Sequence, residues 1–135
     1  MTTIRERKHR LSPTLYYGQI IISFTGCIKG RIPILNDIQV FDALTKILIE
    51  TLNRRHCDAH VFLFMPDHFH LLIQGKGDDS NLLDFMKDFK QRSGYWLSDR
   101  SLKAAATAKW QKDFYDHILR KDEDIKDQVT YILKN

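Results

Sequence analysis

The sequence has little of what builds several well-known protein classes. It holds two cysteines, three prolines and six glycines in 135 residues. The two cysteines, Cys27 and Cys57, are too few for a disulfide scaffold or a cysteine-rich zinc site, so both are expected to be ordinary thiols in a reducing compartment. No segment rich in proline, glycine or serine divides the chain, and no part of it repeats. We therefore expect a single domain over residues 1–135.

Long hydrophobic runs are also absent. No aliphatic run exceeds three residues, the length of Ile20–Ile22, whereas a membrane-spanning helix needs about 20 apolar residues. Residues 1–14 are expected to form a basic arm, and the apolar stretch of about 7–15 residues found in a signal peptide does not follow its charges. These absences predict a cytoplasmic protein with no membrane partner.

The excess of positive charge is small. Lysine and arginine number 21 against 17 aspartates and glutamates, which gives a net charge of +4. This excess permits a polyanionic partner such as nucleic acid, but it is far below the charge density of a histone-like protein. Hydrophobic residues make up 43% and aromatic residues 11% of the chain, and these fractions exclude wholesale disorder.

Hydrophobic patterning predicts the first part of the fold. Residues 19–27 are rich in β-branched and aromatic side chains, which favours a strand. Asn36 or Asp37 can cap a helix that runs to about Asn53. Apolar residues recur in this helix at intervals of mostly three or four, which predicts one buried stripe. The residues of that stripe are Ile38, Phe41, Leu44, Ile47, Leu48 and Leu52.

Two further strands are predicted over Ala59–Met65 and His68–Gln74, joined across Pro66 and Asp67 as a hairpin. Ser80 is expected to open a second helix to about Leu97. Residues 98–109 are ambiguous, residues 114–119 favour a fourth strand, and the acidic residues 122–124 suit the first turn of a last helix. The first six elements form the split βαβ pattern of an α+β, ferredoxin-like fold. We expect an antiparallel sheet with helices on one face, plus a C-terminal helix that carries a tyrosine.

Two histidines stand two residues apart in the predicted third strand. His68 and His70 should therefore leave the same face of the sheet, about 6.6 Å apart along the backbone, while Phe69 points into the core. Two nitrogen ligands on one rigid face suit a metal ion. Taken alone, however, such a pair more often consists of ordinary sheet histidines.

The last helix presents a tyrosine on its polar side. Tyr131 lies roughly 145° from the centre of the apolar stripe, and Asn135 is its neighbour one turn later. A tyrosine that points away from the apolar stripe does not pack in the core. Taken alone, this pattern is typical of an ordinary exposed tyrosine. The stripe itself consists of Ile125, Val129, Ile132 and Leu133.

Three segments together resemble a known family. Met65–Leu72 (MPDHFHLL) is similar to the signature of the HUH single-tyrosine transposases, which include insertion-sequence and repeat-associated (REP-associated) tyrosine transposases. Those relatives usually carry asparagine where this chain has Asp67. Trp110–His117 (WQKDFYDH) resembles the family's W-Q-x-x-F-x-D/E-H block, and Tyr131–Asn135 (YILKN) resembles its Y-I-x-x-N tyrosine helix. The resemblance runs from about Tyr17 to the last residue.

This resemblance implies a metal-dependent transposase or nickase that acts on single-stranded DNA. Tyr131 would attack a phosphodiester, leaving a 5′-phosphotyrosine and a free 3′-hydroxyl, and a second 3′-hydroxyl would complete strand transfer. A divalent metal, Mg²⁺ or Mn²⁺, would be held by His68, His70 and Asn135. Because a phenol with a pKa near 10 is only about one part in a thousand ionised at pH 7, the cation would assist the attack. The expected partner is single-stranded DNA that bears a hairpin, and the resemblance also allows a homodimer.

Contacts to DNA are expected from basic residues near the helix ends and from one aromatic residue. Each basic cluster would otherwise be an ordinary solvated face. Tyr95 is a second tyrosine by residue type, but its position beside Trp96 and Leu97 favours packing, and His117 is expected to be an ordinary strand histidine. The predicted DNA contacts are Lys87, Lys90, Arg92, Arg120 and Lys121, with Tyr115 as a residue on which a base could stack.

Two other functions remain open from the sequence. Members of the family usually continue past the position of Asn135. Three interpretations stay open for this chain: a truncated relic, an engineered fragment, or a compact version in which a partner supplies order. A metal ligand in a fraying last turn is weak. The protein could then be a catalytically weakened, single-strand-binding relic of the same fold. Alternatively, it could be a metal-dependent phosphodiesterase that uses water as the nucleophile in place of Tyr131.

Overall fold

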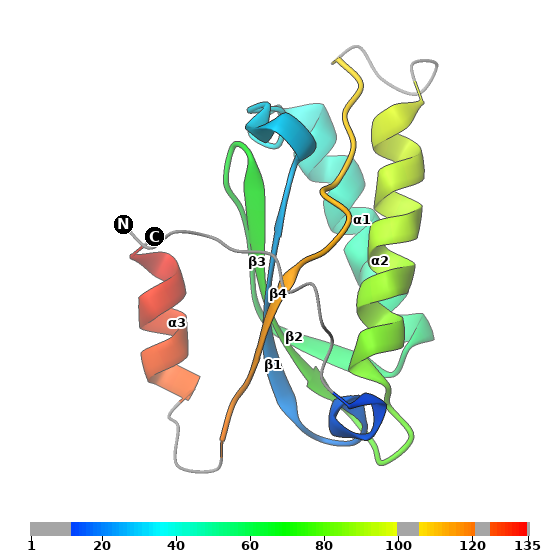
Figure 1. The fold of residues 1–135 in the computed structure, drawn as a ribbon, viewed down its shortest axis with the longest axis vertical. Coiled ribbons are helices and arrows are strands. Elements are labelled where there is room, and N and C mark those ends of the chain that lie inside the picture. Colours follow the sequence, from blue (N-terminus) through cyan, green and yellow to red (C-terminus); the bar gives the residue numbers. More distant parts are fainter. Residues whose placement is uncertain (1–11, 100–105, 121–124, 135) are drawn as a thin grey trace.

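The computed structural model alternates strands and helices in the predicted order (Figure 1). It describes residues 12–99, 106–120 and 125–134. Two short 3₁₀ turns, η1 (Pro13–Tyr16) and η2 (Lys29–Arg31), flank the first strand. The regular elements are β1 (Ile21–Cys27), α1 (Ile38–Arg54), β2 (Cys57–Phe64), β3 (His68–Gly75), α2 (Leu82–Ser98), β4 (Tyr115–Ile118) and α3 (Ile125–Leu133).

The four strands form one antiparallel sheet in the order β2-β3-β1-β4. Strand β1 lies between β3 and β4, which is the arrangement of the split βαβ pattern. Helices α1 and α2 cover one face of this sheet, and α3 lies against the opposite face (Figure 1). The predicted α+β, ferredoxin-like fold with a separate C-terminal helix is therefore confirmed.

The main core lies between the sheet and the pair α1 and α2. Alternate residues of β1 and β3 point into it, because successive side chains of a strand leave opposite faces. Phe69 lies at its centre, fully buried. The centroid of its ring is 5.7 Å from that of Phe89 and 5.0 Å from that of Trp110, in edge-to-face geometry. Such pairs add to the energy gained from area burial alone.

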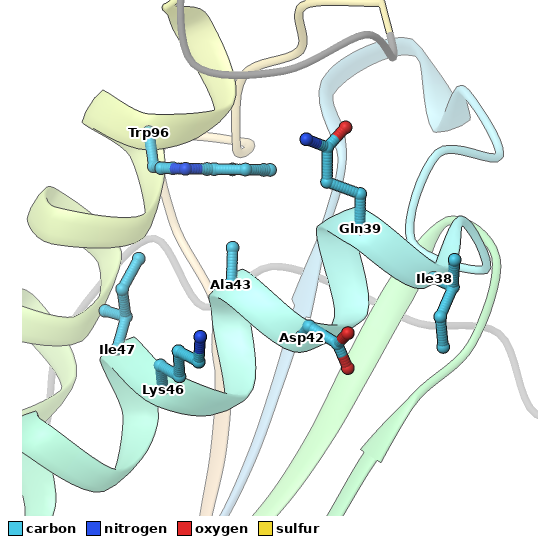
Figure 2. Close-up of a pocket in the computed structure, with 7 residues that line it drawn as sticks. All are labelled: Ile38, Gln39, Asp42, Ala43, Lys46, Ile47 and Trp96. Atoms are coloured by element: carbon cyan, nitrogen blue, oxygen red, sulfur yellow. The ribbon is translucent and has the colours of Figure 1, made fainter.

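Helix α1 begins where predicted, but its buried stripe differs in part. The Asp37 side chain accepts hydrogen bonds from the backbone N–H groups of Gln39 and Val40, so it caps the helix. Leu44 and Leu48 are buried as predicted, whereas Ile38 is 73% exposed. Figure 2 shows Ile38 at the outer end of the first turn, while the Trp96 ring lies above the later turns. The prediction was wrong for this end, where Phe41 is also exposed, because the buried line runs through Val40, Leu44, Leu48 and Thr51.

Helix α2 is capped by Asn81 and not by Ser80. The Asn81 side chain accepts hydrogen bonds from the N–H groups of Leu83 and Asp84, both at 3.1 Å. The Ser80 hydroxyl instead donates to the carbonyl of His56 at 2.6 Å. Ser80 therefore fixes the loop before α2 to the connection between α1 and β2, and this long-range contact could not be predicted from local spacing.

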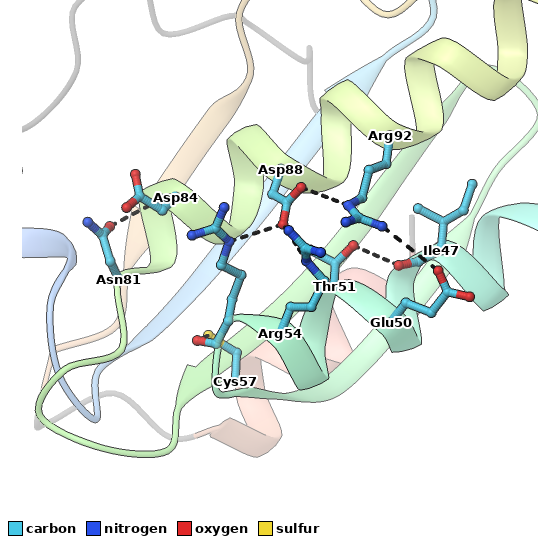
Figure 3. Close-up of polar contacts among 10 residues, drawn as sticks. Ile47, Glu50, Thr51, Arg54, Cys57, Asn81, Asp84, Asp88 and Arg92 are labelled. Atoms are coloured by element: carbon cyan, nitrogen blue, oxygen red, sulfur yellow. Dashed lines mark hydrogen bonds and ion pairs between the residues drawn. The ribbon is translucent and has the colours of Figure 1, made fainter.

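A buried carboxylate joins α1 to α2. Asp88 is 8% exposed and accepts hydrogen bonds from the Nε atoms of Arg55, at 3.0 Å, and Arg92, at 2.9 Å. Figure 3 shows its carboxylate between Arg54 and Arg92. Burial alone would raise the pKa of Asp88, but the hydrogen bonds from Arg55 and Arg92 outweigh it and bring the pKa below its usual value.

Helix α3 buries one line of side chains. Ile132 is 1% exposed, and Ile125 and Val129 are half-buried, as their shared stripe predicts. Leu133 is 64% exposed, so the prediction was wrong for this residue. It lies about 100° beyond Ile132 around a helix of nine residues, which meets the sheet along a single line. The predicted acidic opening at 122–124 lies outside the described residues.

Only the last residues of the predicted N-terminal arm belong to the described structure. Residues 1–11 of the predicted basic arm lie outside the described residues, and Pro13 and Thr14 belong to η1. Both cysteines are buried and form no disulfide with each other. Burial raises the pKa of Cys57 to about 11, so its thiol stays protonated at neutral pH. Among the residues described, no helix is long and apolar enough to cross a membrane.

Candidate functional site

Both histidines of β3 lie on the face opposite the main core. His68 pairs with Cys27 and His70 with Thr25 across the β1–β3 ladder. The residues are 8% and 5% exposed, and their ring centroids are 5.1 Å apart, with the ring planes nearly perpendicular at 88°. The prediction that the two imidazoles share one face, with Phe69 in the core, is confirmed.

Each imidazole has a hydrogen-bond partner at Nδ1. The Nδ1 atom of His70 lies 3.0 Å from the hydroxyl oxygen of Thr25, and that of His68 lies 2.7 Å from Oδ1 of Asp67. Because an ionised carboxylate only accepts hydrogen bonds, the proton of neutral His68 belongs on Nδ1, and its lone pair is on Nε2. That Nε2 is buried and has no hydrogen-bond partner within the described part of the chain. A buried imidazole nitrogen that has no hydrogen-bond partner, on a ring whose other nitrogen bonds to a carboxylate, suits a metal ligand.

The electrostatics of the site keep His70 neutral and Asp67 negatively charged. Burial, with a smaller contribution from the charge of His68, lowers the pKa of His70 to about 4. His70 is therefore neutral at pH 7, which is the form that binds a metal. Burial acts to raise the pKa of Asp67, but hydrogen bonds from Arg31 and His68 outweigh it, and the pKa lies below its usual value. Asp67 thus remains a carboxylate.

The donor set fits two positions of a divalent cation. Histidine nitrogens whose second ring atom bonds to a carboxylate or hydroxyl are common metal ligands. No cluster of three or more histidine, cysteine, aspartate or glutamate side chains forms around a common point in the residues described. The predicted third ligand, Asn135, lies outside them. The residues present therefore suit a cation that takes its other ligands from a carboxamide, phosphate or water.

Tyr131 lies on the helix that covers this same face. Helix α3 is on the side of the sheet away from α1 and α2 (Figure 1), and its Tyr131 side chain is 53% exposed, on the polar side as predicted. The neighbouring Ile132 is buried, so the two side chains leave the helix on different sides, one inward and one toward solvent. The fold brings the tyrosine helix and the histidine pair to one side of the sheet.

Strand β4 adds a further aromatic residue to this face. Tyr115 pairs with Thr25, and His117 pairs with Ser23, so both leave the sheet on the side of His70. Tyr115 is 41% exposed, whereas Phe114 is 6% exposed. The strand alternation predicted for this pair is therefore confirmed, and an exposed ring lies on the same face as the imidazoles.

The predicted basic contacts are divided between the two sides of the molecule. Lys87, Lys90 and Arg92 belong to α2, across the sheet from the histidines, while Arg120 follows β4. The Lys90 ammonium group donates to the backbone carbonyls of Gln111, at 2.7 Å, and Lys112, at 2.9 Å. The structure thus gives Lys90 and Arg92 partners within the fold. Lys87 and Arg120 are exposed, and Lys121 lies outside the described residues.

Sequence reasoning misjudged one residue and missed two. Tyr95 was expected to pack but is 70% exposed. It lies on the outer side of α2, whereas the adjacent Trp96 and Leu97 face the core. Thr25, which contacts His70, gave no local signal because the contact depends on the register of β1 against β3. Arg31, whose Nε donates to Asp67 at 2.8 Å, gave no local signal because the contact joins two loops distant in sequence.

Comparisons with known proteins agree with this arrangement. The family described as "Transposase IS200 like" matches residues 16–135. A curated relative from Haemophilus influenzae, described as a REP-associated tyrosine transposase, is 28% identical over 79 residues, covering 53% of this chain. The match spans 44% of the length of that relative.

Two solved structures share the fold. A REP-associated tyrosine transposase bound to a REP hairpin has a TM-score of 0.69 at 16% identity, covering 93% of this chain and 68% of that one. A transposase from Deinococcus radiodurans has a TM-score of 0.59 at 19% identity, covering 98% and 97%. Because the family match extends over nearly the whole sequence, the chain that carries this histidine pair and this tyrosine helix belongs to the IS200-like transposase family.

Proposed function

We propose that the protein is a metal-dependent, single-tyrosine transposase that nicks and rejoins single-stranded DNA. The observation that carries the proposal is the pair of buried imidazoles on the face covered by α3. Their Nδ1 atoms are both engaged, and Nε2 of His68 has no hydrogen-bond partner in the described part of the chain. Tyr131, on that helix, is the nucleophile of the reaction.

The chemistry assigned to each residue follows from its environment. His68, His70 and Asn135 would hold a Mg²⁺ or Mn²⁺ ion. Such an ion, when bound, neutralises charge that develops on the scissile phosphate. The oxygen of Tyr131 forms a bond to phosphorus, the bond to the 3′ oxygen breaks, and the phenolic proton passes to solvent while the 3′ oxygen takes one up. The products are a 5′-phosphotyrosine and a 3′-hydroxyl. A second 3′-hydroxyl reverses the step, so no ATP is needed.

The partner we propose is a single DNA strand that carries a hairpin. One structural neighbour, at a TM-score of 0.69, is bound to a REP hairpin. In this chain, Tyr115 offers an exposed ring on the face of the imidazoles, on which an unpaired base can stack. Arg120, exposed two residues after β4, would contact phosphate.

The test is covalent capture on Tyr131. The full chain is incubated with single-stranded hairpin oligonucleotides and Mn²⁺, and the protein is analysed by intact-mass and peptide mass spectrometry. A DNA adduct on Tyr131 is expected, and it should disappear in Tyr131→Phe and after chelation of the metal. Tyr95→Phe is the matched control, because Tyr95 is also an exposed phenol and lies on the other side of the sheet.

Other outcomes separate the alternatives. Cleavage that persists in Tyr131→Phe would identify a phosphodiesterase that uses water. Binding of the hairpin without cleavage by the unaltered chain, at any Mn²⁺ concentration, would identify a DNA-binding relic. Either result contradicts the proposed transposase.

A further inference from the structure

The Asp67 carboxylate joins two residues with its two oxygens. Its Oδ2 accepts a hydrogen bond from Nε of Arg31 at 2.8 Å, and its Oδ1 lies 2.7 Å from Nδ1 of His68. Guanidinium, carboxylate and imidazole thus form one chain of contacts that ends at Nε2 of His68, the nitrogen that has no partner in the part of the structure described. A metal ligand held in this way has both its tautomer and its ring orientation fixed.

Arg31 is held in place by an unusual backbone conformation. It has a φ angle of +56°, in the left-handed region, and follows Gly30 at +76°. A residue with a side chain adopts this region at a cost, and such residues gather where the surrounding structure requires a particular direction of the side chain. Here the turn directs the guanidinium toward Asp67.

The two loops that carry the pair are fixed to each other by the main chain. The N–H of Ile28 donates to the carbonyl of Asp67 at 2.8 Å, and the N–H of Leu35 donates to that of Pro66 at 2.9 Å. The segment between β1 and α1 therefore lies against the turn of the β2–β3 hairpin. This backing distinguishes the Arg31–Asp67 pair from a mobile surface ion pair, even though the Arg31 side chain is 43% exposed.

The two histidines differ in what positions them. His70 lies within β3, and its partner Thr25 is the residue opposite it in the sheet. His68 is the first residue of β3, at the edge of the hairpin turn, and its imidazole partner is the adjacent turn residue Asp67. The sheet alone can orient His70, whereas His68 needs a support from another loop.

We propose that Arg31, acting through Asp67, is the positioning residue that holds His68 with its Nε2 lone pair directed at the metal site. This inference rests on the proposed function, in which His68 binds the metal. Arg31 itself touches neither metal nor DNA in this scheme. It fixes the carboxylate, and the carboxylate fixes the imidazole.

The experiment compares Arg31→Ala with Arg31→Lys in the full chain. Long-range ¹H–¹⁵N spectra of histidine-labelled, metal-free protein report the tautomer of His68 directly, with His70 as an internal reference. The dissociation constant for Mn²⁺, measured by electron paramagnetic resonance, reports the consequence. Arg31→Ala should give a mixture of His68 tautomers and weaken Mn²⁺ binding at least about tenfold, and Arg31→Lys should restore part of both. Arg54→Ala, which removes an exposed arginine paired with Asp88, is the matched control and should change neither.

Each outcome decides the inference. If Arg31→Ala leaves the His68 tautomer unchanged while its melting temperature matches that of the unaltered chain, Arg31 does not position His68. If Arg31→Ala does not fold, Asp67→Asn replaces it: the amide oxygen can still accept from His68, but the charge that holds Arg31 is gone, so weaker Mn²⁺ binding is expected and unchanged binding overturns the inference. The tautomer of His68 is measured without metal or DNA, so its result does not depend on whether a DNA adduct forms on Tyr131. A failure of the inference about Arg31 and a failure of the proposed transposase can therefore be told apart.

Discussion

The two faces of the sheet are made by the same strands but serve different purposes. On β3, Phe69 and Leu71 point to the core under α1 and α2, while His68 and His70 point to the face under α3. The first face is lined mainly by aromatic and aliphatic side chains in mutual contact. The second buries hydroxyls and imidazoles, and one of its nitrogens has no partner in the described chain. Residues of the first face should therefore determine stability, and residues of the second should determine activity.

The largest effect that sharpens this comparison is expected at Phe69. Its ring contacts two other aromatic rings and is fully buried, so Phe69→Ala should lower the free energy of unfolding by about 3–5 kcal/mol. Denaturant unfolding followed by circular dichroism measures the change. Phe62→Ala, on the neighbouring strand and 42% exposed, is the control and should cost much less. Phe62 pairs with Leu71 and leaves the sheet on the same side as Phe69, so equal losses for both variants would mean that burial of the side chain does not set its contribution to stability.

A glycine of β1 provides the next largest effect. A Cβ atom built on Gly26 would overlap the ring of Phe69, so Gly26→Ala should destabilise the protein by about 1–3 kcal/mol through overpacking. Gly94, inside α2, has room for a Cβ, with the nearest atom of Trp110 at 3.4 Å. Gly94→Ala should instead stabilise by up to about 1 kcal/mol, because alanine favours a helix. Thermal unfolding of both variants tests the pair, and opposite signs are expected.

Replacement of the buried carboxylate of Asp88 tests whether a charged group, in addition to apolar contacts, stabilises the packing of α1 against α2. Because hydrogen bonds to Arg55 and Arg92 lower its pKa in the folded state, its contribution is complete above the usual pKa of 3.8 and is lost as the pH falls through the folded value. Asp88→Asn should therefore cost about 1–2 kcal/mol at pH 7. The two proteins should converge in stability below pH 3.8.

The same measurement on Asp42→Asn supplies a control. Asp42 is an exposed carboxylate on α1, so its replacement should leave the unfolding free energy nearly unchanged between pH 7 and pH 3. If Asp88→Asn and Asp42→Asn have parallel stability curves over that range, the link between α1 and α2 contributes nothing through its charge.

Much of the fold could be predicted because its signals are local. Runs of β-branched, aromatic and apolar residues predicted the strands, and the two-residue period of a strand predicted the shared face of His68 and His70. Asn36 or Asp37 predicted the start of α1. Two of the residues predicted wrongly lie at the ends of helices. Ile38 and Leu133 are apolar and fit a helical stripe, but the helix extends beyond the surface that would bury them. Periodicity predicts the angle of a side chain around the helix axis. It does not predict whether another part of the protein packs against the helix at that position along the axis.

The site could be predicted only in part, for the same physical reason. The histidine pair is encoded within three residues, whereas its support comes from Thr25 on another strand and Arg31 on another loop. Contacts between segments distant in sequence follow from the register of the sheet and the path of the loops. No local pattern contains that information. Charge counting likewise placed Lys90 among the DNA contacts, while the structure shows its ammonium group bonded to two carbonyls of the fold.

The smallest expected change in stability belongs to the residue with the largest expected change in activity. Tyr131 is 53% exposed, so Tyr131→Phe should alter the unfolding free energy by less than about 1 kcal/mol while abolishing the DNA adduct. Its neighbour Ile132, 1% exposed, should behave in the opposite way: Ile132→Ala should speed hydrogen exchange across α3 by loosening the helix from the sheet. A large loss of stability in Tyr131→Phe would show that this phenol packs the fold, and the division between a stabilising face and a reactive face would no longer hold.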